Sequence, residues 1–407
     1  MRKMKDSGIE WIGDIPVDWS VIKFKYLHNG LNTGEAIDKN FWSSNERDKV
    51  FYTAGLIPIR TNYKDFPEWK YTKDNDLLLA RNGTPYVYFP EIDACYTDHI
   101  IRAEMKKGIN RRFVQYGLQQ SISSVVVESV SIATWSASLW NEQTISWPSY
   151  NEQCRIVEFL DKKCAEIDAV VEKTKATIEE YKKLKQSIIT EAVTKGIREN
   201  HEMMGTEYEW IGQIPSTWKA IKVKWLLDER KERSEAGEEE SLSMSQKFGL
   251  VPTKEMDMIP NMAASFVGAK LVYVGDLVFN KLKAHLGVFA VSKYDGLVSP
   301  DYAVYYPTGV AIVKYLEYLF KTPQYIAEFR KKSSGVGVGL TRLYTDDLFS
   351  IYCSLPPMDE QEEIVAYLDK KCVEMDTLIA RKISLLEEME SYKKSVIYEY
   401  VTGKKEV

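Results

Sequence analysis

The sequence contains few of the residues on which most metal and redox sites depend. Only five cysteines and four histidines occur among its 407 residues. The cysteines form no Cys-x-x-Cys pair, and their odd, scattered set favours free thiols over a disulfide framework or a zinc site; they are Cys95, Cys154, Cys164, Cys353 and Cys372. We therefore expect the chain to hold no metal.

Long apolar segments are also missing. No run of about 18 apolar residues occurs, and the start MRKMKDSGIEWIG has no apolar core of the kind found in signal peptides. Neither a membrane span nor secretion is indicated, so we expect a cytoplasmic protein. With 44% apolar and 28% charged residues, the chain has an ordinary globular composition and room for two or more domains.

A general excess of positive charge is the third absence. The formal net charge is −5, and residues 1–150 carry 18 basic and 18 acidic side chains, whereas residues 356–407 carry 8 and 12. A protein that gripped DNA mainly by neutralising phosphates would show a broad basic excess. Any DNA binding by this chain is therefore expected to be local, or shared with a partner.

What the chain does contain is a tandem duplication. The decamer EWIGDIPVDW (10–19) returns as EWIGQIPSTW (209–218), at an offset of 199 residues. A second pair, PSYNEQCRIVEFLDKKCAEID (148–168) and PPMDEQEEIVAYLDKKCVEMD (356–376), matches at an offset of 208. Each half therefore has the order decamer, body, Glu-Gln segment and long charged stretch, with about eight residues inserted in the second copy.

The two long charged stretches are predicted to be helices that pair as an antiparallel coiled coil. Apolar or small residues recur at alternating spacings of three and four from Val157 to Ala192 and from Val365 to Tyr400. Lys185, Lys382 and Lys393 interrupt this seam and are expected to fix register. Asn151 and Asp359 are the expected N-caps. A solvated charged helix is the alternative for either stretch taken alone.

The bodies between these markers are predicted to be mixed α and β. DNDLLLARNGTPYVYFP (74–90) and GDLVFNKLKAHLGVFAVS (275–292) align at Asp76 and Asp276, and each is typical of a strand, a polar turn and a second strand. The fold class is thus α+β, with two mixed α/β domains separated by two long helices and related by an internal pseudo-two-fold duplication. The predicted boundaries are 1–147, 148–200, 201–355 and 356–407.

Together these markers resemble the specificity subunit of type I restriction-modification systems. The resemblance is carried by the EWIGxIPxxW decamers, the two Glu-Gln segments, GDLVFNK with GLVSPDY, and the coil after each body, and it covers essentially the whole chain. It implies two target recognition domains that each read one half of a split, asymmetric double-stranded DNA target. The two helices would act as a spacer and dock two modification (methyltransferase) subunits.

The resemblance also implies that this chain catalyses nothing itself. S-adenosylmethionine, ATP and magnesium are expected on partner subunits, with restriction subunits present in the full complex, and no cofactor is expected on this chain. Its sequence contains no GxxxxGK[ST] motif and no Asn/Asp-Pro-Pro-aromatic motif. GVGVG (335–339) resembles a nucleotide or methyl-donor loop, but it follows no clear strand and has no counterpart in the first half.

The residues expected to contact DNA lie in the two body turns and in one basic segment. Arginine reads guanine and asparagine reads adenine through paired hydrogen bonds, whereas basic side chains and glycine-rich amides hold phosphates. The candidates are Arg81, Asn82 and Thr84 in the first body, and Asn280, Lys281, Lys283, His285, Arg330, Lys331, Lys332 and Arg342 in the second. Solvated surface loops are the alternative for each set.

The first body departs from this pattern near its end. Thr134 stands where the second half has Arg342, so a contact carried by residues 335–342 is not assumed for residues 127–134. For the decamers, Trp11, Trp19, Trp210 and Trp218 are expected to pack with Ile12, Ile15 and Pro16 where each body meets the scaffold. Base stacking is the alternative for these tryptophans.

Two rival functions remain at this point. One is a coiled-coil scaffold that binds only proteins. The other is a nuclease that uses Glu91, Glu104 and Lys106, although a chain this rich in charge produces such spacings by chance. Sequence-dependent methylation by the complex would argue against the scaffold, and cleavage with metal alone would argue for the nuclease.

Overall fold

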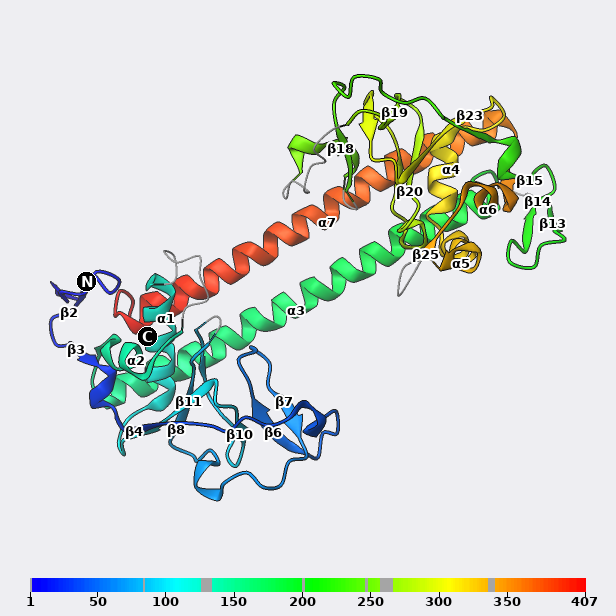
Figure 1. Cartoon of the computed structure of the whole chain (residues 1–407). Helices are drawn as coiled ribbons and strands as arrows, with labels where there is room; N and C mark the ends of the chain where they lie inside the picture. Colours follow the sequence, from blue (N-terminus) through cyan, green and yellow to red (C-terminus); the bar gives the residue numbers. More distant parts are fainter. Residues whose placement is uncertain are drawn as a thin grey trace. The chain divides into compact units, whose positions relative to one another are not determined.

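The computed structural model describes residues 2–82, 85–125, 134–199, 202–245, 248–256, 266–335 and 341–407. The chain forms two compact units: unit 1 contains Met1–Lys175 and Ser384–Val407, and unit 2 contains Ala176–Ile383. Each unit therefore combines one body with one part of each long helix, α3 (Tyr150–Lys195) and α7 (Met358–Val401) (Figure 1).

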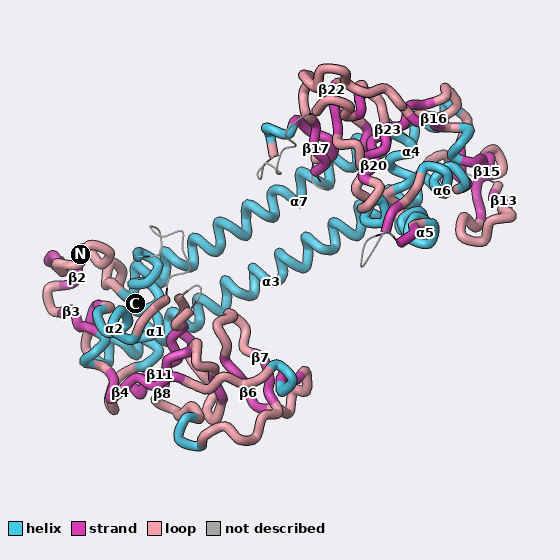
Figure 2. The backbone as a smooth tube through the Cα atoms, in the orientation of Figure 1, coloured by secondary structure: helices cyan, strands magenta, loops and turns pink. Residues whose placement is uncertain are grey.

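Unit 1 contains twelve strands and two shorter helices among its described residues. The strands are short and joined by long loops (Figure 2). They are β1 (Met4–Asp6), β2 (Asp14–Pro16), β3 (Ser20–Lys23), β4 (His28–Thr33), β5 (Trp42–Ser43), β6 (Lys49–Tyr52), β7 (Ile59–Thr61), β8 (Asp76–Ala80), β9 (Val87–Tyr88), β10 (Cys95–Tyr96), β11 (Ile100–Met105) and β12 (Thr144–Trp147), with α1 (Arg111–Val125) and α2 (Ala137–Glu142).

Unit 2 repeats this plan with additions. Its described elements are β13 (Met203–Gly205), β14 (Gln213–Pro215), β15 (Lys219–Lys222), β16 (Leu227–Glu229), β17 (Leu242–Ser245), β18 (Gly249–Pro252), β19 (Lys270–Val272), β20 (Leu277–Asn280), β21 (Phe289–Val291), β22 (Gly296–Val298), β23 (Tyr302–Pro307), α4 (Val313–Phe320), α5 (Pro323–Lys332), β24 (Ser334–Gly335), β25 (Thr341–Arg342), α6 (Thr345–Ser350) and β26 (Tyr352–Leu355).

The same antiparallel four-stranded sheet forms the centre of both bodies. Its order is β4-β11-β8-β9 in unit 1 and β16-β23-β20-β21 in unit 2. The two predicted strand-turn-strand segments are confirmed, because Leu78 pairs with Tyr88 and Val278 pairs with Ala290. The mixed α and β class predicted from the sequence is likewise confirmed.

The central strands are apolar throughout because both faces of the sheet are covered. In β8, Leu77 and Leu79 join a core with residues of α1, whereas Leu78 and Ala80 face a second core built from the outer sheet β10-β6-β7-β5. In unit 2, Phe279 packs toward the helices and Val278 toward β17 and β19. One face of each sheet thus carries the repeated scaffold, and the other carries the part that differs between the bodies.

The long helices pair antiparallel within each unit, as predicted. In unit 1 Lys393 Nζ lies 2.6 Å from Asp168 Oδ1, and the rings of Phe159 and Tyr400 are 4.3 Å apart between centroids. In unit 2 Lys185 Nζ lies 2.6 Å from Asp376 Oδ1. Two of the three lysines that interrupt the apolar seam, Lys185 and Lys393, therefore receive an aspartate from the facing helix, which agrees with the expected role in register.

The predicted seam is confirmed for α3, where seven of its residues are buried: Leu160, Cys164, Ile167, Val171, Thr174, Ile178 and Ala192. The predicted N-caps were wrong by two residues. The helices begin at Tyr150 and Met358, so Asn151 and Asp359 lie inside the first turn. In α3 the Ser149 hydroxyl instead accepts a hydrogen bond from the Glu152 amide at 3.4 Å.

The decamers build the corner where each body meets its helices, and their predicted packing role is confirmed. Trp19 and Trp218 are buried, at 2% and 1% exposure, and Trp19 Nε1 donates to Glu152 Oε2 of α3 at 2.9 Å. Ile12 and Ile15 share a core with residues of α3 and α7. Because these indoles are enclosed by protein, base stacking is not their role.

Candidate nucleic-acid interface

A repeated backbone contact defines the candidate interface in both bodies. After β8 the carbonyl of Arg81 accepts a hydrogen bond from the amide of Trp135 at 2.7 Å, and after β20 the carbonyl of Lys281 accepts one from the amide of Leu343 at 3.0 Å. The turn after the central strand is therefore held by the same later segment in each half. Because Trp135 and Leu343 are equivalent, Thr134 and Arg342 occupy equivalent positions in the two halves, as the sequence alignment had it.

In the first body the turn presents an exposed arginine and a half-buried asparagine next to a histidine. Asn82 Nδ2 lies 2.7 Å from His99 Nδ1, and the Arg81 amide donates to the His99 carbonyl at 2.8 Å. His99 reaches this turn because β11 pairs antiparallel with β8, with Ile100 opposite Ala80. Arg81 and Asn82 are thus brought together at the surface, and Thr84 lies outside the described residues.

The second body gathers more positive charge at the equivalent place. The pKa of Lys281 is lowered, first by burial and then by the neighbouring charge of Lys270, with Arg342 adding to the effect. The acidic partners lie at the edge of this cluster: Lys270 Nζ is 3.3 Å from Glu229, and an Arg342 terminal nitrogen is 3.0 Å from Asp301. An incoming phosphate or base acceptor would relieve the mutual repulsion of these cations.

The remaining candidates of the second body lie on adjoining elements. His285 Nδ1 is 3.4 Å from the Thr341 hydroxyl, and β24 pairs with β25 so that Ser334 faces Arg342. Arg330, Lys331 and Lys332 end α5 with exposed side chains just before β24, and Lys283 is also exposed. Asn280 is half-buried, and its side-chain oxygen accepts from the Leu282 amide at 3.1 Å. Residues 336–339 of the glycine run lie outside the described residues.

Two residues of this surface were missed by reasoning from sequence. His99 and Lys270 stand 17 and 11 positions from the candidates that they contact, Asn82 and Lys281. No local motif marks either residue. Pairing of β11 with β8 brings His99 to its turn, whereas Lys270 lies on β19, which pairs with β22 and reaches Lys281 by packing against the central sheet.

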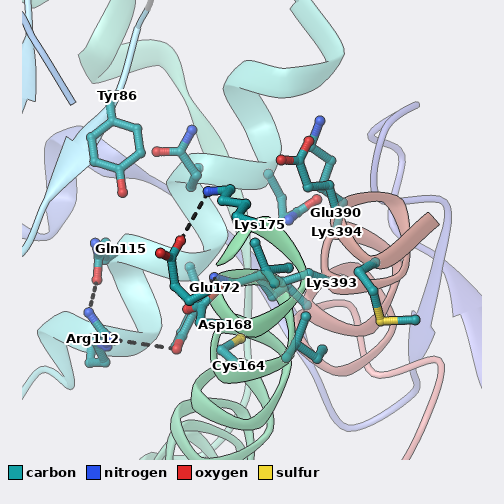
Figure 3. A pocket seen from close by; sticks show the side chains of 17 residues that line it. Tyr86, Arg112, Gln115, Cys164, Asp168, Glu172, Lys175, Glu390, Lys393 and Lys394 are labelled. Atoms are coloured by element: carbon teal, nitrogen blue, oxygen red, sulfur yellow. Dashed lines mark hydrogen bonds and ion pairs between the residues drawn. The ribbon is translucent and has the colours of Figure 1, made fainter. Parts of the chain in front are cut away.

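A groove at the junction of body and helices occurs in each unit. In unit 1 it has a volume of about 590 Å³, and Figure 3 shows Arg112 of α1, Glu172 and Lys175 of α3, and Lys393 and Lys394 of α7 around it. In unit 2 the corresponding groove has a volume of about 580 Å³. Each groove is bordered by an ion pair between the helices, so charges of both signs line it.

A tyrosine holds the body to the helix beside each groove. The Tyr116 hydroxyl donates to Asp161 at 2.6 Å, and the Tyr318 hydroxyl donates to Asp369 at 2.6 Å. Burial, and then the hydrogen bond to Asp161, raises the pKa of Tyr116 well above its usual range. The repeated Asp of each LDKK segment is thus a structural acceptor for the body.

The described residues show no cluster of three or more His, Cys, Asp or Glu side chains able to hold a metal. Glu104, one of the three residues of the rival nuclease hypothesis, faces Asp76 across the sheet and accepts from Asn29 at 3.3 Å.

In the same described part of the chain, no helix is long and apolar enough to cross a membrane. All five cysteines carry free thiols.

These features define a class of protein with two mixed α/β bodies and a duplicated scaffold of paired helices. Each body has an equivalent turn after its central strand, and the side chains on the two turns differ. No family model matches the chain. Over 96% of its length it is 21% identical to the type I restriction enzyme EcoDI specificity subunit of Escherichia coli, covering 89% of that subunit. It is 23% identical to the MjaVIII specificity subunit of Methanocaldococcus jannaschii, again over 96% of this chain and covering 93% of that subunit.

Among solved structures, the chain is similar to one described as showing complex assembly and conformational transition of the type I R-M system. The TM-score is 0.68 at 13% identity, covering 96% of this chain and 99% of that chain. The similarity in fold therefore extends over nearly the whole molecule. The resemblance to type I specificity subunits indicated by the sequence is confirmed.

Proposed function

We propose that this chain is the sequence-specific DNA-binding subunit of a type I restriction-modification complex. Each body reads one half of a split, asymmetric double-stranded target, and the chain itself catalyses no reaction. Two modification subunits dock on it and carry S-adenosylmethionine, whereas restriction subunits of the full complex use ATP and magnesium. The complex acts on DNA in the cytoplasm.

The observation that carries this proposal is the shared turn with unlike side chains. In both bodies a backbone amide of the later segment donates to the turn carbonyl, from Trp135 to Arg81 and from Leu343 to Lys281. The two turns are therefore held in equivalent positions. Base readout depends on which donors and acceptors reach the edges of the bases. A frame that is repeated while its exposed residues differ is suited to reading two different sequences.

The side chains of each turn suggest different readouts. The first body offers an arginine and an asparagine, which pair with guanine and adenine edges, and it has neutral Thr134 where the second has Arg342. The second body offers Lys281, His285 and Arg342 beside the basic end of α5. These side chains favour contacts to phosphates and hydrogen bonds to guanine. The local positive charge agrees with a chain that lacks a broad basic excess.

The helices supply the separation between the two half-sites. A helix of 46 residues extends about 69 Å at about 1.5 Å per residue, and α3 has that length. Two DNA-binding modules held at a fixed spacing engage half-sites separated by a set number of base pairs. The length and pairing of α3 and α7 would therefore fix the spacer in the target.

Mapping of methylated adenines in cells that carry the complete system tests this proposal. We expect one bipartite motif of two unlike halves with a constant spacer. Purified complexes should methylate DNA that contains this motif and not DNA with either half scrambled. Methylation independent of sequence would leave a protein scaffold as the better account, and cleavage by this chain with metal alone would establish the nuclease.

A further inference from the structure

Each scaffold exposes one large aromatic side chain that its packing does not require. Tyr26 in unit 1 is 58% exposed and Trp225 in unit 2 is 62% exposed. The two residues occupy the same place in the repeated segments SVIKFKYL and KAIKVKWL. Single exposed aromatics are common on protein surfaces, but here an exposed aromatic occurs at the same position of both halves although the residue itself has changed between them.

The local backbone accounts for the exposure. Phe24–Tyr26 and Val223–Trp225 each form one turn of 3-10 helix, in which positions three apart share a face. Phe24 and Leu27 are therefore buried, and Val223 and Leu226 repeat this arrangement. The two residues between them in each turn, a lysine and the aromatic, necessarily point outward.

In both turns a side chain from elsewhere in the body holds the carbonyl of the aromatic residue. The Tyr26 carbonyl accepts from Lys106 Nζ at 2.9 Å, and the Trp225 carbonyl accepts from the Thr308 hydroxyl at 2.8 Å. The preceding lysines lie over the rings, with Lys25 Nζ 5.4 Å and Lys224 Nζ 4.8 Å from the ring centroids. A rigid, exposed aromatic beside a lysine is the kind of anchor that dominates protein interfaces.

We infer that these two surfaces each dock one copy of the same protein partner, the modification subunit, through a face that carries acidic side chains. This inference rests on the proposed function. A surface present once per half fits a partner present in two copies, and each surface carries two lysines. Lys23 and Lys25 share a single acidic neighbour, Glu142, whereas Lys222 lies over the Tyr352 ring at 5.2 Å.

The first body provides a matched control for the test. Trp69 is also 58% exposed and has Lys70 Nζ 5.0 Å from its ring centroid, but it lies in a segment that the second half does not repeat. Replacing Trp69 by alanine removes a similar exposed ring without touching the repeated surface. Any loss of binding specific to Tyr26 and Trp225 can therefore be separated from a general effect of losing an aromatic side chain.

The experiment combines full-length chain with the modification subunit of the same system, measured by native mass spectrometry and titration. We expect two copies bound to the wild type and to Trp69→Ala, one copy to Tyr26→Ala or Trp225→Ala, and none to the double variant. The dissociation constant at each altered surface should rise about 30-fold or more, the effect of losing an interface hot spot. Lys25→Glu with Lys224→Glu should also weaken binding, since neither side chain enters the core.

Retention of two tightly bound copies by the double alanine variant would overturn this inference while leaving the proposed function intact. So would loss of DNA affinity with both copies retained, which would make these surfaces phosphate contacts. Failure of the wild type to bind any modification subunit would instead refute the proposed function itself.

Discussion

The hydrogen bond from Tyr116 to Asp161 is expected to stabilise the attachment of the first body to α3. The perturbation is Tyr116→Phe, which removes one hydroxyl from a side chain that is 8% exposed and leaves the ring in place. The lost bond joins a hydroxyl to a carboxylate at 2.6 Å. Hydrogen bonds to charged groups contribute about 1.5–3 kcal/mol to the free energy of unfolding.

The expected loss is smaller than that range because Asp161 keeps other interactions. Its side chain is 43% exposed and still accepts from Arg112 Nε at 2.8 Å. We therefore expect Tyr116→Phe to cost about 1–2 kcal/mol, a fall in melting temperature of about 2–8 °C for a unit of this size. Tyr392→Phe is the matched control, because that side chain is 47% exposed on α7 and water can replace any partner of its hydroxyl.

The pH dependence gives an independent check with a defined sign. The pKa of Tyr116 is raised in the folded state, first by burial, so the phenol keeps its proton while the unfolded chain loses it above about pH 10. The unfolded state then binds fewer protons than the folded state, and stability falls as pH rises. The advantage of wild type over Tyr116→Phe is thus complete below pH 10 and shrinks above it. Calorimetry that finds the two proteins within about 0.5 kcal/mol at pH 7, the range of neutral surface substitutions, would refute this reasoning.

Three further predictions follow from the geometry. Gly403→Ala should destabilise the protein by about 2 kcal/mol or more, because φ at Gly403 is +71° and an added Cβ would lie 2.6 Å from Pro16 Cδ. Gly30→Ala is the control, since a Cβ at Gly30 would meet open space. Denaturant unfolding of both variants measures the difference, and equal midpoints would contradict the prediction. Arg342→Ala should weaken methylation about 10- to 150-fold for one half-site only, measured with substrates altered in either half; an equal loss for both halves would contradict it. Burial raises the pKa of Cys95 to about 11. Alkylation of this thiol at pH 8, monitored by mass spectrometry, should therefore be slower than that of an ordinary thiol by about 100-fold or more. Labelling at the ordinary rate would show the thiol to be accessible and ionised.

The duplicated scaffold could be predicted because its signals are local. The spacing of apolar residues in α3 predicted the buried seam, and the acidic partners of the seam lysines Lys185 and Lys393 confirm the antiparallel pairing. The sequence could not predict which of the two cores each residue of Leu77–Ala80 joins. An unbroken apolar run shows only that both faces of the strand are covered. The helix starts were misplaced by two residues because Ser149, rather than Asn151, caps α3.

The candidate interface was predicted only in outline, for a physical reason. Arg81 and Lys281 sit in turns that the sequence marks with polar residues, whereas the segment that holds each turn comes 54 and 62 residues later. These two separations differ by eight, which matches the inserted length and places the insertion between Lys281 and Leu343. The contact of His99 depends on strand pairing and that of Lys270 on the packing of one sheet against another, so no spacing within the sequence indicates them.

Exchange of one body tests the central claim most directly. Residues 20–147 would be replaced by the corresponding body of another type I specificity subunit, and the methylated adenines would be mapped in cells that carry the altered system. We expect one half of the methylated motif to change while the other half and the spacer stay the same. A change in both halves, or in neither, would contradict the claim that each body reads its own half of the target.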